Sequence, residues 1–188
     1  MPRMIIMGIF MAVTMSFLTA TPGKLGAQVD VSSDPQGDKL DPKADTQTFL
    51  TIAVEEQQVA IALGQLAAQR AENKQVKEYG SKMVEDHKKV RREAEQLASK
   101  HQVPLPTKLT PEDKQKVDEL SRLSGHEFDR AYMNVSLHNH ETSLEEFQRH
   151  VDTMRYPDLR EWFTSTLPLI KAHRDQARSV KSSLQTNP

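Results

Sequence analysis

Four titratable residues interrupt the apolar series of four long amphipathic segments, at positions where leucine is expected. They are Glu56, His87, His140 and His173. His87, for example, follows Met83 by four residues and precedes Val90 by three, which is the spacing of one buried helix face. Burying such groups without partners costs about 1–3 kcal/mol each. We therefore expect them to pair with one another, with water or with a metal ion.

The chemistry that these residue types favour is metal binding. Neutral imidazoles with a carboxylate suit iron, manganese or zinc, and all four residues lie near the middle of their segments, so an up-and-down bundle would bring them to a similar level. We predict a metal site of Glu56, His87, His140 and His173, and no catalytic residue. The alternative interpretation is that the histidines are hydrogen-bonded packing residues of the core.

A di-iron oxidase of the ferritin type is disfavoured by the residues around these histidines. Such sites use Glu-x-x-His pairs. Here the residues three positions before the histidines are apolar, namely Val84, Leu137 and Ile170.

The segments that position these residues are predicted helices. Apolar residues at steps of three and four predict long helices over residues 46–72, 73–102, 124–152 and 157–184, and a shorter one over 110–123. No segment alternates as a strand does. We predict an all-α, ferritin-like four-helix bundle, with the short helix in the crossover between the second and third long helices.

The N-terminal region has the pattern of a secretory signal peptide. Arg3 precedes an apolar run from Met4 to Leu18, and small residues lead to Ala27. The run is shorter than the roughly 20 residues that span a bilayer, although an uncleaved anchor is the alternative. We predict a signal peptide over residues 1–27, a disordered lead-in over 28–44, the bundle over 45–184 and a tail over 185–188.

Composition narrows the class of protein and its location. Removing residues 1–27 takes away two basic side chains and leaves 23 basic and 26 acidic ones, a net charge of −3. This balance does not favour nucleic-acid binding. The chain has no cysteine, so it is neither disulfide-linked nor a lipoprotein. We expect a periplasmic protein with no transmembrane segment after signal cleavage. Its composition is compatible with a protein partner and with a homo-oligomer.

An ordered set of motifs resembles the bacterial envelope family catalogued as domain of unknown function 4142. The resemblance covers roughly residues 46–182. Its motifs are Met83-Val84, Asp86-His87, Leu105-Pro106, Leu123-Ser124-Gly125, Phe128-Asp129 and Leu167-Pro168, with Leu120, Tyr132, His140, Leu144, Phe147 and His173. The resemblance implies an exported, ferritin-like helical bundle and no established activity.

Three hypotheses about function follow. The first is a non-enzymatic periplasmic protein with a structural, stress-related or partner-binding role. The second is a metal-binding ferritin-like protein that uses the four core residues to hold Fe, Mn or Zn. The third is an acid-responsive protein, because buried imidazoles become charged at mildly acidic pH.

Overall fold

The computed structural model describes residues 42–186, which form five α-helices, one 3₁₀ turn and no strand. In chain order the elements are α1 (Pro42–Arg70), α2 (Lys74–Lys100), α3 (Pro111–Ser121), α4 (Gly125–His150), η1 (Val151–Thr153) and α5 (Pro157–Thr186). The predicted all-helical bundle is confirmed. The predicted signal peptide lies outside the described residues. None of the described helices is long and apolar enough to cross a membrane.

The helix boundaries differ from the predicted ones at both ends of the domain. The first helix begins at Pro42, so residues 42–44, which we predicted to be disordered, are helical. Proline is favoured at the first turn of a helix, where its missing N–H costs nothing. The last helix continues to Thr186, two residues beyond its predicted end.

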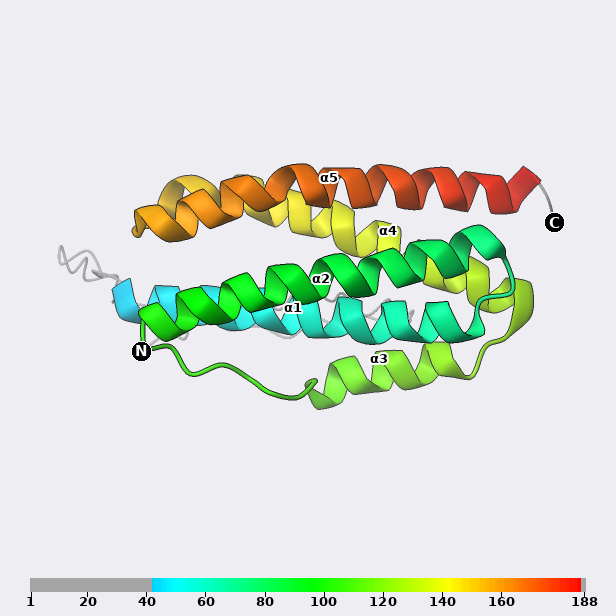
Figure 1. The fold of residues 1–188 in the computed structure, drawn as a ribbon, viewed down its shortest axis with the longest axis horizontal. Helices are drawn as coiled ribbons and strands as arrows, with labels where there is room; N and C mark the ends of the chain where they lie inside the picture. Colours follow the sequence, from blue (N-terminus) through cyan, green and yellow to red (C-terminus); the bar gives the residue numbers. More distant parts are fainter. Residues whose placement is uncertain (1–41, 187–188) are drawn as a thin grey trace, which may run out of the picture. The chain divides into compact units, whose positions relative to one another are not determined.

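The long helices form two hairpins. Helix α1 packs along α2, and α4 packs along α5 (Figure 1). The two hairpins meet where α2 contacts α5 and where α1 contacts α4. The short helix α3 lies in the connection between α2 and α4, as predicted, and it packs on α1 and α4.

Helices α1 and α2 approach closely at a pair of glycines. A Cβ atom on Gly80 would lie 2.7 Å from the Cβ of Ala67 and 2.9 Å from the carbonyl oxygen of Gly64. Neither distance is compatible with normal packing, so the two backbones come this close because a hydrogen stands in place of a side chain. This contact fixes α2 against α1 less than two turns before His87 in the sequence.

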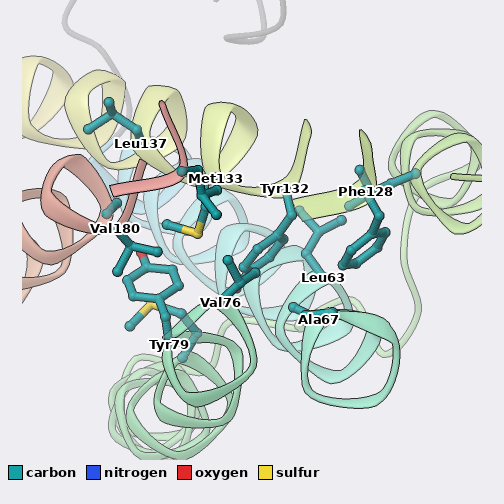
Figure 2. Close-up of a cluster of buried hydrophobic side chains, with 14 of the residues drawn as sticks. Leu63, Ala67, Val76, Tyr79, Phe128, Tyr132, Met133, Leu137 and Val180 are labelled. Carbon is teal, nitrogen blue, oxygen red and sulfur yellow. The ribbon is translucent and has the colours of Figure 1, made fainter. Parts of the chain in front are cut away.

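The main core lies between the two hairpins. Its largest fully buried side chains include Tyr79, Tyr132 and Phe128, and Figure 2 shows them together with aliphatic residues of α1, α2, α4 and α5. The rings of Tyr79 and Tyr132 meet edge to face, with centroids 6.0 Å apart. A second, smaller cluster contains Leu50, Ala98, Val103 and Leu159.

The buried face of α1 is rotated from the predicted one by about one residue in its first half. Glu56 follows Ile52 by four residues, and this helical spacing predicts both in the core, but both side chains are exposed. The buried positions include Leu50, Val54 and Gln57. One residue corresponds to about 100° of rotation around a helix, so this shift moves Glu56 to the outside and brings Gln57 inside.

A buried carboxylate from α4 holds the turn between α1 and α2. Asp129 is fully buried, and its two oxygens accept hydrogen bonds from the backbone N–H groups of Glu72, at 3.2 Å, and Asn73, at 2.7 Å. The Asn73 side chain in turn accepts from the N–H groups of Gln75 and Val76 at the start of α2. Asp129 therefore satisfies donors that a helix start leaves without partners.

We expect Asp129→Ala to lower the free energy of unfolding by about 2 kcal/mol, because two backbone N–H groups lose their buried acceptor. Asp129→Asn keeps one acceptor oxygen, so its loss should be smaller. Urea denaturation of both variants beside the parent measures the difference. An alanine variant within about 0.5 kcal/mol of the parent would show that the turn does not depend on this carboxylate.

Candidate functional site

Three of the four predicted site residues come together in the structure. His87 on α2, His140 on α4 and His173 on α5 each offer one ring nitrogen, and these nitrogens lie within 4.8 Å of one another. The ring centroids are 5.7, 5.2 and 5.3 Å apart. The cluster therefore joins one helix of the first hairpin to both helices of the second.

The sequence around each histidine explains why its ring faces inward. His87 lies one turn from the buried residues Met83 and Val90, and His140 lies between Leu137 and Leu144. His173 precedes buried Ala177 by four residues, and only 1 % of its surface is exposed. His140 is also buried, whereas the His87 ring is half-buried with its Nε2 atom fully enclosed. Apolar neighbours one turn away on the same helix face thus position all three rings.

The outer nitrogen of each ring is held by a hydrogen-bond acceptor. The distances are all 2.7 Å: from His87 Nδ1 to Gln57 Oε1, from His140 Nδ1 to the carbonyl oxygen of Ser136, and from His173 Nε2 to Asp86 Oδ2. A backbone carbonyl and a carboxylate only accept hydrogen bonds. Each outer nitrogen of His140 and His173 therefore carries a proton.

The same conclusion holds for His87 because the amide of Gln57 has a fixed orientation. Gln57 Nε2 donates to the carbonyl oxygen of Ala53 at 3.1 Å, so its Oε1 atom faces His87 and accepts from Nδ1. In the neutral state, all three rings thus have a protonated outer nitrogen and an inner nitrogen with a lone pair.

The inner nitrogens are His87 Nε2, His140 Nε2 and His173 Nδ1. All three are buried, and no protein group within the described part of the chain hydrogen-bonds to them. Unpaired acceptors in a protein interior cost free energy, and three lone pairs directed into one shared space also repel one another. A cation placed among them would remove both costs.

Burial makes the neutral form of these histidines the stable one. Desolvation lowers the pKa of His140 to about 4, with a further decrease from His173 and an opposing effect of the hydrogen bond to Ser136. Desolvation, followed by the charges of His140 and His173, lowers the pKa of His87 well below 6.5. For His173 desolvation also lowers the pKa, although Asp86 opposes it. Neutral imidazole is the form that binds metal ions.

Glu56 does not join this cluster. Its side chain is exposed. Among the residues that the structure describes, the group that could hold a metal ion consists of the three histidines alone. Gln57, the next residue, occupies the inward position and orients His87. At the inward position, where the carboxylate of Glu56 was predicted, the structure has the amide of Gln57.

The residues that support the rings were not predicted from the sequence. Asp86 reaches His173 across the contact between α2 and α5. The hydroxyl group of Tyr79 lies 2.7 Å from Ser136 Oγ and donates a longer hydrogen bond to the carbonyl oxygen of His173. The only sequence signal for Asp86 was its position next to His87 in the motif.

The fold and the site together define a helical bundle with a buried three-histidine cluster. The chain belongs to the family described as Domain of unknown function (DUF4142), whose pattern matches residues 31–180. The predicted family is thus confirmed. No curated protein matches the chain.

A solved structure supports the helical fold. The chain is similar to a crystal structure of a DUF305 fragment from Deinococcus radiodurans, with a TM-score of 0.63 and 14 % sequence identity. The match covers 78 % of this chain and 97 % of the fragment. At this identity, the likeness concerns the fold alone.

Proposed function

We propose that this protein binds one divalent metal ion through His87, His140 and His173 and that its role is non-enzymatic metal binding. One observation carries the proposal: three buried inner nitrogens share one space, and each ring is fixed by an acceptor on its outer nitrogen. Metal-binding histidines in proteins typically have such an outer partner, which sets the tautomer and the direction of the ring.

Zinc fits this donor set best among the three predicted metals. Iron and manganese sites in proteins usually include carboxylate ligands, whereas three imidazoles with one further ligand are a common zinc arrangement. Tetrahedral zinc with Zn–N distances of about 2.0–2.1 Å places its nitrogens about 3.3 Å apart. The inner nitrogens now lie within 4.8 Å of one another, so binding would draw the three rings closer together.

The location and the finer architecture are part of the same proposal. The signal-like pattern of residues 1–27 supports export to the periplasm. Two helix hairpins with a short helix in the long connection between them support a ferritin-like arrangement. The absence of cysteine leaves the histidines as the strongest metal ligands in the chain.

Titration of the chelator-treated full chain with Zn²⁺ tests the proposal. We expect one equivalent to bind, and the double substitution His87→Ala with His140→Ala to abolish that binding. His138→Ala is the matched control, because His138 lies on the same helix as His140 but is exposed. Binding that survives in the double variant, or no binding by the parent, would reject the site. The histidines would then be part of the scaffold, and the structural or partner-binding hypothesis would replace this one.

A further inference from the structure

The three outer partners of the histidines differ in charge. Gln57 offers an amide oxygen and Ser136 a backbone carbonyl, both neutral, whereas Asp86 offers a carboxylate. Lys82, one turn earlier on α2, donates to the same Asp86 oxygen, Oδ2, that accepts from His173, and both distances are 2.7 Å. One carboxylate oxygen is thus shared between a lysine at the surface and a buried ring.

We propose that Asp86 is the positioning residue that sets the metal affinity of the three-histidine site, and that Lys82 weakens that affinity by competing for Asp86 Oδ2. This inference rests on the proposed function, because it concerns the same site. Asp86 touches the ring of a proposed ligand and not the ion itself.

The physical basis is the effect of a carboxylate on the imidazole that it accepts from. A negative acceptor on the outer N–H raises the electron density of the ring, so the inner nitrogen becomes a stronger donor to a cation. The two neutral acceptors orient their rings without adding charge. His173 should therefore be the strongest of the three donors.

Lys82 has the opposite effect on the same carboxylate. Its ammonium group shares Asp86 Oδ2 and carries a positive charge near the site. The Lys82 side chain is 47 % exposed and Asp86 20 %, whereas His173 is 1 % exposed, so the three groups form a path from solvent to the cluster. Removing Lys82 would leave this oxygen to His173 alone.

The hydrogen bond between Asp86 and His173 also crosses between the hairpins. His87 follows Asp86 directly on α2, and its ring lies 5.2 Å from that of His173 on α5. Neighbouring residues of α2 therefore supply one ligand and orient another. A change at Asp86 should alter the position and basicity of His173 while leaving His87 and His140 with their own acceptors.

Competition against a chromophoric zinc chelator measures the affinity of the full chain and its variants. We expect Asp86→Asn, which retains an acceptor oxygen but loses the charge, to raise the Kd for Zn²⁺ by about 10- to 100-fold. We expect Lys82→Gln to lower the Kd several-fold. Combined with Asp86→Asn, the same substitution should change the logarithm of the Kd by less than half as much. Arg91→Gln is the matched control. Arg91 also lies on α2 and forms an ion pair with an acidic residue one helical turn after it, Glu95.

The outcomes separate this inference from the proposed function. If the parent binds one equivalent but Asp86→Asn stays within twofold of its Kd, Asp86 does not set the affinity and the inference is rejected. An unchanged or raised Kd for Lys82→Gln rejects the competition, and this exposed substitution remains informative even if Asp86→Asn does not fold. If the parent binds no zinc, the proposed function itself fails.

Discussion

Zinc should raise the free energy of unfolding of the chelator-treated protein by about 4 kcal/mol when its free concentration is a thousand times the Kd. The reason is that the three proposed ligands come from α2, α4 and α5, so they meet only in the folded chain. An ion that binds the native state alone stabilises it by mass action. Urea denaturation with and without Zn²⁺ measures the gain, and an excess of chelator should reverse it.

Two variants test whether this gain in stability comes from the three-histidine site. The double substitution His87→Ala with His140→Ala should remove it, because a single histidine of the cluster remains. His138→Ala should retain the full gain, since this exposed residue lies outside the cluster. A gain of equal size in the double variant would show that zinc acts elsewhere on the chain and would contradict the site.

Without metal, the protein should lose stability as the pH falls from about 6.5 to about 4. The unfolded chain takes up protons on its histidines near their ordinary pKa of 6.5, whereas the pKa of buried His140 is about 4. The unfolded state thus binds more protons throughout this window, and stability decreases as the pH decreases. For His140 alone the difference corresponds to about 3 kcal/mol.

The charged groups that face the cluster modify this dependence without reversing its sign. Asp86 raises the pKa of His87 and His173, and Lys82 lowers that of His173. Desolvation raises the pKa of Asp86, but the hydrogen bonds and charges of Lys82 and His173 outweigh it and leave that pKa lowered. The stability that Asp86 contributes is therefore lost only below its ordinary pKa of 3.8, outside the window of the histidines.

Comparison of the parent with His140→Gln at each pH isolates the contribution of His140. Glu55, which is half-buried, has a raised pKa, chiefly through desolvation, and it acts in the opposite direction. Because this carboxyl group is present in both proteins, its effect cancels in the difference. The variant should have a shallower loss of stability between pH 6.5 and 4. Parallel curves would mean that His140 is not held neutral in the folded protein.

Much of the fold could be predicted because the apolar residues recur with the period of a helix. The turn at Asn73, the short helix after Thr110 and its place between the second and third long helices all followed from local signals, since capping residues act within one turn. Thr110 does accept from the backbone N–H of Asp113, at 3.1 Å. The predicted start of the first helix, residue 46, was wrong by four residues because Pro42 was taken as part of a polar lead-in.

The histidines were identifiable because each lies in an otherwise apolar series and near the middle of its helix. The structure brings all three together, whereas Glu56 lies outside. The rotation of α1 could not be predicted from hydrophobicity, because an apolar residue, Ile52, is exposed and a polar one, Gln57, is buried. Gln57 is buried at low cost because its amide bonds both His87 and the Ala53 carbonyl.

The pairing of Asp86 with His173 is the part of the site that no local pattern predicts. The two residues are 87 positions apart, and their contact depends on how α2 and α5 are rotated against each other. A pattern of residue types within one helix contains no information about that rotation. Ser136 could not be predicted for a different reason: its backbone carbonyl orients His140 whatever its side chain is.

X-ray absorption at the zinc edge of the zinc-loaded full chain tests the central claim most directly. The three-histidine site predicts three imidazole nitrogens at about 2.0–2.1 Å from the ion, with the outer-ring scattering that identifies histidine. The double substitution His87→Ala with His140→Ala should lose this signal. A spectrum of the parent dominated by oxygen ligands, with one imidazole or none, would contradict the claim that His87, His140 and His173 bind the metal together.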